Sequence, residues 1–306
     1  MSGAVSQKLA IIGAGNMGNA IARLFATNGW EVALIDPSDD AREKSRQRLH
    51  DTLHQPGMPA ISWHAGLDAA YDAALVIEAA PEKAELKRQI YRDLEAGCAT
   101  DTLIATNTSG ISINELAAGL QHPGRFVGTH FFTPADIIPL VEVVAGEQTD
   151  PAASERIVDI LRAVGKLPVL VRKDIPGFIA NRLQHALARE AMSLLEKGVA
   201  TAEDIDTVAK WSLGIRLALT GPLEQRDING LDVHHAIAGY LYSDLENRQT
   251  PSRVLTEKVE AGDLGVKTGR GFYDWQDAQR QASLLEKEAA LRELVAHLKA
   301  DPHSRG

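Results

Sequence analysis

The first half of the chain alternates between short apolar runs and longer amphipathic segments. The runs are rich in valine, isoleucine, leucine and alanine, which is typical of strands buried in a parallel sheet. In the segments between them, apolar residues recur at helical spacing. The runs lie at residues 9–12, 31–36, 61–63, 74–77, 103–106, 126–130, 140–144 and 167–171. This alternation predicts an α/β fold with a doubly wound sheet and helices on both of its faces.

The pattern changes after Asp174, beyond which no segment has the period of a strand. Helical patterns cover or begin at about residues 178–197, 201, 222, 231–241 and 284–298. We therefore expect an α/β domain at residues 1–174 and a separate all-α C-terminal domain at residues 175–306. The helical part is rich in apolar residues and has more apolar faces than one small core needs, which favours a homodimer formed through it.

A glycine-rich turn, Gly13-Ala14-Gly15-Asn16-Met17-Gly18, joins the first apolar run to the first amphipathic segment. Gly13 allows the tight bend, Gly15 lets the backbone approach a pyrophosphate, and Gly18 lets the helix pack close to the strand. The N-terminus of that helix faces the anion. Asp36 ends the second run, where a carboxylate accepts hydrogen bonds from a ribose 2′-OH and repels a 2′-phosphate. Together these features predict a Rossmann-type domain that binds NAD in preference to NADP, with Asn16 and Met17 also at the cofactor.

Composition narrows the classes of function. The chain has 306 residues and a net charge of −9, which argues against a nucleic-acid-binding surface. Cys98 is the only cysteine, so no intrachain disulfide is possible, and no metal-ligand cluster surrounds it. The N-terminus lacks the pattern of a signal peptide, and no apolar stretch approaches the ~18 residues of a membrane span. We expect a cytoplasmic protein with a small-molecule substrate, no metal, and no nucleic-acid or membrane partner.

Two polar sites follow from the ends of the apolar runs. His130 ends one run and Glu142 lies in the next, and an imidazole held by a carboxylate is a good general base near neutral pH. The alternative is a hydrogen-bonded structural histidine, with Glu142 facing solvent.

The hydroxyls and the amide of residues 107–110 can bind a substrate oxygen or the nicotinamide. Without further information, a turn that caps the next helix, with Ser112 or Asn114 nearby, is the better interpretation of that segment.

Four segments resemble the motifs of the L-3-hydroxyacyl-CoA dehydrogenase family in order and in spacing. They are residues 107–110, 130–134, 138–142 and 174–182, and the resemblance runs from about residue 8 to residue 275. As a set they are far more specific than any one motif. The resemblance implies that His130 is the general base, that Glu142 is its partner, and that Ser109 and Asn181 contact the substrate oxygen.

The resemblance also bears on the cofactor and on assembly. It implies that Glu82 and Lys87 line the nicotinamide-ribose side, and we place Asn107 with them at the cofactor. In this family the helical domain forms the dimer contact and closes over the substrate. A homodimer is therefore expected from the resemblance as well as from the apolar faces.

The chain departs from family members that act on acyl-CoA. Those members usually have Asn where this chain has Thr133, and Met-Lys where it has Ile138-Pro139. Many also carry a long charged helical excursion between the second and third strands, which supports the CoA tail. Here the corresponding segment, about residues 49–61, is short and contains Pro56, Gly57 and Pro59.

Residues 214–224 resemble instead the branch that acts on free hydroxy acids, which includes gulonate and carnitine dehydrogenases. Arg216 can then clamp a substrate carboxylate through a bidentate pair, and an ordinary surface ion pair is the alternative. Arg42, Lys44, Arg46 and Arg48 keep the CoA option open, because cations can meet its phosphates.

The function that we predict is the NAD-dependent oxidation of the 3-hydroxyl of a small hydroxy acid, or of a 3-hydroxyacyl substrate, to the 3-keto product. One alternative is a 3-hydroxyacyl-CoA dehydrogenase acting on 3-hydroxybutyryl-CoA. Another, of a different class, is a non-catalytic NAD-binding or structural protein, since a fold does not fix a function.

Overall fold

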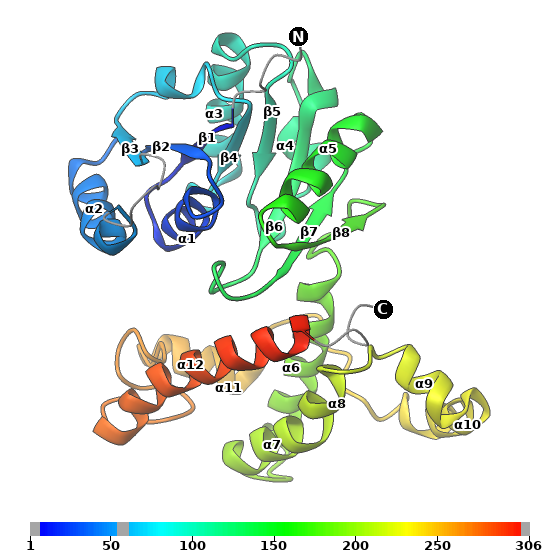
Figure 1. Cartoon of the computed structure of the whole chain (residues 1–306). Coiled ribbons are helices and arrows are strands. Elements are labelled where there is room, and N and C mark those ends of the chain that lie inside the picture. Colours follow the sequence, from blue (N-terminus) through cyan, green and yellow to red (C-terminus); the bar gives the residue numbers. More distant parts are fainter. Residues whose placement is uncertain (1–6, 54–60, 301–306) are drawn as a thin grey trace. The chain divides into compact units, whose positions relative to one another are not determined.

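The computed structural model describes residues 7–53 and 61–300 (Figure 1). The turn-rich part of the segment expected at residues 49–61, with its two prolines, lies mostly outside these ranges. The chain divides into two compact units, Met1–Arg182 and Leu183–Gly306.

The first unit is built on one eight-stranded sheet. Its order is β3-β2-β1-β4-β5-β6-β7-β8, and every neighbouring pair is parallel except β6 and β7. The strands are β1 (Lys8–Ile12), β2 (Glu31–Ile35), β3 (Ile61–His64), β4 (Leu75–Glu78), β5 (Leu103–Thr106), β6 (Phe126–Phe131), β7 (Leu140–Val144) and β8 (Leu167–Val171). The apolar runs therefore became strands, which confirms the Rossmann-type doubly wound sheet.

Helices cover both faces of this sheet. They are α1 (Asn16–Ala26), α2 (Asp39–Leu53), α3 (Ala84–Gly97), α4 (Ile113–Ala117) and α5 (Pro151–Ala163), with 3₁₀ turns η1 (Leu67–Ala70) and η2 (Pro123–Arg125). Because strand side chains alternate, Leu9 and Ile11 join the core under α1, α2 and α5, whereas Ala10 and Ile12 join the core under α3 and α4. Burying each large apolar side chain in these cores stabilises the fold by about 1.5–3 kcal/mol.

The second unit is helical, as the sequence predicts. Its elements are α6 (Ala180–Glu196), which begins in the first unit, α7 (Ala202–Val208), a π-helical turn (Ala209–Gly214), α8 (Ile215–Leu217), α9 (Glu224–Asn229), α10 (Leu231–Leu241), α11 (Arg253–Glu260) and α12 (Ala278–Ala300). The hydroxyl of Thr201 accepts a hydrogen bond from the amide of Asp204 and caps α7. The sequence did not indicate α11, which the hydroxyl of Ser252 caps.

Many large apolar side chains of this unit lie on its surface. Trp211, Leu223, Tyr242 and Leu285 are 75, 82, 73 and 76% exposed. The homodimer remains a prediction. Across the described ranges, none of the helices combines the length and the apolar character that crossing a membrane requires.

Candidate active site

The predicted site residues of the first unit gather where its parallel strands end. The loops that follow β1, β2, β4, β5 and β6 leave the sheet at its carboxyl edge, the usual place for ligands in such sheets. Because β7 runs antiparallel to β6, the first residues of β7 lie at this same edge. Residues far apart in sequence are thereby brought to one edge of the sheet.

The glycine-rich loop has the geometry that its sequence predicts. Gly13 has a φ of +112°, and a Cβ there would lie 2.7 Å from the carbonyl oxygen of Ala79. A Cβ on Gly18 would lie 1.9 Å from the carbonyl oxygen of Gly13, so only glycine lets α1 approach the loop. A Cβ on Gly15 would meet no atom within 4 Å, which leaves open space beside the start of α1. The loop therefore fits a dinucleotide pyrophosphate.

Asp36 follows β2 and is tied to the same loop. Its Oδ2 accepts a hydrogen bond from the amide of Ala14 at 2.9 Å, and its Oδ1 accepts one from the amide of Ser38 at 2.9 Å. A carboxylate oxygen has a second lone pair, so both oxygens can still accept a ribose hydroxyl.

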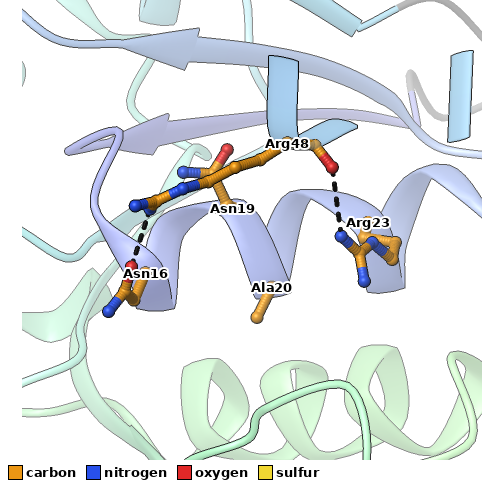
Figure 2. A pocket seen from close by; sticks show the side chains of 5 residues that line it. All are labelled: Asn16, Asn19, Ala20, Arg23 and Arg48. Carbon is orange, nitrogen blue, oxygen red and sulfur yellow. Dashed lines mark hydrogen bonds between the residues drawn. The ribbon is translucent and has the colours of Figure 1, made fainter. Parts of the chain in front are cut away.

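A small cavity of about 210 Å³ lies between α1 and α2 (Figure 2). At one end of it, Nη1 of Arg48 donates to Oδ1 of Asn16 at 2.7 Å. At the other end, Nη2 of Arg23 donates to the carbonyl oxygen of Arg48 at 3.3 Å. The guanidinium of Arg48 is thus held against the first turn of α1.

His130 and Glu142 face each other across β6 and β7. They are a directly opposed pair in the antiparallel register, and both are buried. Nδ1 of His130 lies 2.8 Å from Oε2 of Glu142. Oε1 of Glu142 accepts hydrogen bonds from the amides of Ile179 and Ala180, each at 2.9 Å. Burial alone would raise the pKa of Glu142, but the bonds from His130 and these amides outweigh it and hold that pKa below its ordinary value.

A backbone conformation that is unfavourable for an aromatic residue directs those two amides. Gly177 and Phe178 have φ values of +78° and +51°, and Phe178 is fully buried. The ring of Phe178 lies 5.7 Å from that of His130, and the ring of Phe132 lies 4.4 Å from it. The turn before α6 thus fixes Glu142, while two aromatic rings flank the imidazole.

The loop after β5 brings the remaining polar residues together. Oδ1 of Asn107 accepts a hydrogen bond from the amide of Phe131 at 2.9 Å, next to His130. Nδ2 of Asn181 donates to the carbonyl oxygen of Ser109 at 2.6 Å. The hydroxyl of Ser112 caps α4, as the turn interpretation predicted, so this segment is at once a capping turn and a polar edge.

Glu82 and Lys87 also lie at this edge. Oε1 of Glu82 accepts bonds from the hydroxyl of Thr108 at 2.5 Å and from the amide of Ser109 at 2.9 Å. Partial burial would raise the pKa of Glu82, but these bonds and the charge of Lys87 keep it below its ordinary value. Nζ of Lys87 is buried and lies 2.8 Å from Glu78 and 3.3 Å from Glu82.

The sequence interpretation missed Glu78, which is fully buried. A signal was present. Glu78 directly follows the apolar run at residues 74–77, and Lys87 shares a helix face with the buried residues Tyr91 and Leu94. A lysine on an apolar helix face needs a buried acid as its partner.

Arg216 belongs to the second unit, where it is exposed. Its Nε donates to the carbonyl oxygen of Ser212 at 3.0 Å. Within the described residues, no carboxylate lies within ion-pair distance of its guanidinium, which disfavours the ordinary surface ion pair considered from the sequence.

Comparisons with known proteins agree with this architecture. Residues 8–175 match the model of the 3-hydroxyacyl-CoA dehydrogenase NAD binding domain, and residues 177–275 match that of its C-terminal domain. A 5-formyl-3-hydroxy-2-methylpyridine 4-carboxylate 5-dehydrogenase from Mesorhizobium japonicum is 38% identical over 301 residues, covering 95% of this chain and 96% of that protein. A 3-hydroxybutyryl-CoA dehydrogenase from Bradyrhizobium diazoefficiens is 38% identical over 290 residues, covering 90% and 98%.

A solved structure extends the likeness to three dimensions. The crystal structure of a 5-formyl-3-hydroxy-2-methylpyridine 4-carboxylic acid 5-dehydrogenase, described as an NAD⁺-dependent dismutase, matches with a TM-score of 0.87 at 36% identity. The match covers 95% of this chain and 96% of that one. The chain therefore belongs to the 3-hydroxyacyl-CoA dehydrogenase family of NAD-dependent oxidoreductases, and its cofactor is NAD.

Proposed function

We propose that the protein oxidises the 3-hydroxyl of a small free hydroxy acid to the 3-keto acid. The observation that carries the proposal is the buried pair of His130 and Glu142, with 2.8 Å between Nδ1 and Oε2, at the sheet edge that also carries the glycine-rich loop. A buried imidazole with a carboxylate on one nitrogen is arranged to accept a proton on the other.

The tautomer of His130 determines which of its ring nitrogens can take a proton from the substrate. Glu142 can only accept, so the proton of the neutral imidazole is on Nδ1, and Nε2 keeps its lone pair. Nε2 takes the proton of the substrate hydroxyl, and the Glu142 carboxylate stabilises the imidazolium that forms. Bound NAD supplies the hydride acceptor.

Ser109 and Asn181 are the proposed donors to the substrate oxygen as charge develops on it. The bond from the Asn181 amide to the Ser109 carbonyl oxygen holds the two residues side by side and leaves the second hydrogen of that amide free to donate. Donors fixed in advance stabilise such charge without reorganisation, so this pre-alignment supports the assignment.

The charges on α2 favour a free acid over a CoA thioester. The helix carries four acidic and four basic residues. Lys44 pairs with Asp40 and Arg46 with Glu43, and Arg42 pairs with Asp39. The guanidinium of Arg48 donates to Asn16. A helix whose cations already have partners offers the phosphates of CoA little net attraction.

Arg216 supports the same choice. It is an arginine without a carboxylate partner among the described residues, and its planar fork matches a carboxylate bidentately. The Mesorhizobium relative is named for a substrate with a free carboxylate, and the match covers 95% of this chain. We infer that Arg216 holds the substrate carboxylate.

A 3-hydroxybutyryl-CoA dehydrogenase is the second candidate. It is favoured by the Bradyrhizobium relative of that name, which is also 38% identical. A non-catalytic NAD-binding protein is disfavoured, because it has no need of the paired His130 and Glu142.

Substitution of Arg216 separates the two substrate classes. Arg216→Ala is expected to raise KM for a free hydroxy acid more than about tenfold, since a hydrogen bond to a charged group contributes about 1.5–3 kcal/mol, and to leave NAD affinity unchanged. Arg216→Lys should restore the affinity only in part, because an ammonium cannot reproduce the fork. Arg253→Ala, which removes an exposed arginine paired with Glu257 in the same unit, is the matched control. Efficient turnover of 3-hydroxybutyryl-CoA, unaffected by Arg216→Ala, would return the chain to the acyl-CoA branch.

A further inference from the structure

We propose that Glu78 is a positioning residue, which holds the loop at residues 107–110 in place for the reaction. The inference rests on the proposed function, because that loop carries Ser109. Glu78 does not belong to the predicted site, and its side chain is fully buried at the end of β4.

One carboxylate joins three elements of the first unit. Oε1 of Glu78 accepts bonds from Nζ of Lys87 at 2.8 Å and from the amide of Ala80 at 2.6 Å. Its Oε2 accepts bonds from the phenol of Tyr91 and from the hydroxyl of Thr106, the latter at 3.0 Å. Glu78 therefore ties the end of β4 to α3 and to the end of β5.

Two chains of contacts run from Glu78 to the loop. In the first, Nζ of Lys87 lies 3.3 Å from Oε2 of Glu82, whose Oε1 accepts the hydroxyl of Thr108 and the amide of Ser109. In the second, the hydroxyl of Thr106 also accepts a bond from the amide of Thr108 at 3.3 Å. Both chains therefore end on residues 108–109.

The network continues past the loop to the proposed substrate donors. The carbonyl oxygen of Ser109 accepts the amide of Asn181 at 2.6 Å. Burial, and then the charge of Glu78, raise the pKa of Tyr91 well above its ordinary value, so the phenol stays protonated as a donor. The Tyr91 phenol therefore remains a hydrogen-bond donor to Glu78.

The energetics favour a positioning role over a purely stabilising one. A buried ion pair is often no more stabilising than well-packed apolar side chains of the same volume, because taking both charges out of water offsets their attraction. What such a pair adds is direction, since each hydrogen bond fixes one atom against another. Here the hydrogen-bonded atoms run from Glu78 through Lys87 and Glu82 to the amide of Ser109.

Two matched substitutions, one at the last residue of β5 and one at the residue before its first, test the role without removing a buried charge. Thr106→Val removes the hydroxyl that joins Glu78 to the loop. Thr102→Val makes the same change just before the strand begins, where the buried hydroxyl donates to the carbonyl oxygen of Ala73 at 2.8 Å. Thr106→Ser keeps the hydroxyl and is the conservative rescue. Thr106→Val loses two hydrogen bonds, one of them to a buried carboxylate, and Thr102→Val loses one, so the larger loss of thermal stability is expected in Thr106→Val.

Amide hydrogen exchange of residues 107–111 in the holoenzyme with NAD is the deciding measurement. We expect faster exchange there in Thr106→Val, and wild-type exchange in Thr102→Val and Thr106→Ser. The substrate is 3-hydroxybutyrate or its CoA thioester, whichever the wild type turns over. In Thr106→Val, kcat should fall about tenfold, because the contribution of one hydrogen bond to the stability of the transition state is lost. Equal exchange in the two valine variants would overturn the proposal.

A double-mutant cycle with Ser109→Ala shows whether the network acts through the loop. If it does, Thr106→Val costs less in kcat once Ser109 has been replaced, because the group that it positions is gone. Fully independent effects would contradict the positioning role. A wild type that oxidises neither substrate would count against the proposed function alone, since the exchange measurement still decides whether the Thr106 hydroxyl, which links Glu78 to the loop, holds residues 107–111 in place.

Discussion

Replacing Glu142 with glutamine is the most informative single change at the site. The carboxylate accepts on both oxygens, from the amides of Ile179 and Ala180 on Oε1 and from His130 on Oε2. Glutamine has nearly the same shape, but only one of its two terminal atoms can accept. If its oxygen serves the two backbone amides, its NH₂ group faces Nδ1 of His130. The neutral imidazole must then carry its proton on Nε2, where it cannot take one from the substrate.

The magnitude follows from the loss of the base. A positioned general base contributes about 10²–10⁴-fold, so kcat should fall by that factor, and each tenfold corresponds to about 1.4 kcal/mol of barrier. In serine proteases the same acid-to-amide change imposes the wrong tautomer and costs about 10⁴-fold, which favours the upper end. NAD affinity should stay unchanged, because none of the hydrogen bonds of Glu142 reaches the glycine-rich loop or Asp36.

The assay is steady-state NADH formation, combined with NADH fluorescence titration for affinity and thermal unfolding for integrity. Glu147→Gln, an exposed acid just beyond β7, is the matched control and should behave as the wild type. If Glu142→Gln were as fast as the wild type over the whole pH range, Glu142 would not be setting the tautomer of His130, and the proposed mechanism would be wrong.

Four further outcomes are expected. His130→Ala should lower kcat about 10²–10⁴-fold, and full activity of this variant would show that His130 is not the general base. Asp36→Ala should weaken the preference for NAD over NADP in kcat/KM, whereas equal use of both by the wild type would contradict the ribose role of Asp36. Because the pKa of Glu142 is depressed from 4.5, its contribution to the free energy of unfolding is complete above that pH and is lost as pH falls through the folded-state value. Urea unfolding should therefore show a shallower acid decline for Glu142→Gln, and an unchanged slope would refute the linkage. Light scattering at micromolar concentration should give a homodimer joined through residues 175–306, and a monomer would overturn that prediction.

The strands were predictable because burial on both faces imposes continuous apolar runs. The bounds of β5 and β7 agree with the runs at residues 103–106 and 140–144. The direction of β7 was not predicted, although the chain held a clue. Only eight residues, 132–139, join β6 to β7, and a parallel crossover needs a dozen or more, so this connection had to be antiparallel.

The site was predictable in part. The glycine positions of the first loop follow from backbone sterics alone, and the structure bears out their geometry. The opposed places of His130 and Glu142 depend on the antiparallel register of β6 and β7, which residue types do not reveal. The sequence pattern does not single out Glu78, because the apolar run stops at residue 77, one position before the acid that closes β4.

The substrate class is the part that spacing determines least, since it depends on the shape and charge of a pocket rather than on a motif. The most direct test is kcat/KM for NADH formation with a panel of small 3-hydroxy acids, each paired with its own CoA thioester. We expect the free acid to have the higher kcat/KM and to lose that advantage in Arg216→Ala. Higher kcat/KM for 3-hydroxybutyryl-CoA than for every free acid, with no effect of Arg216→Ala, would contradict the proposal.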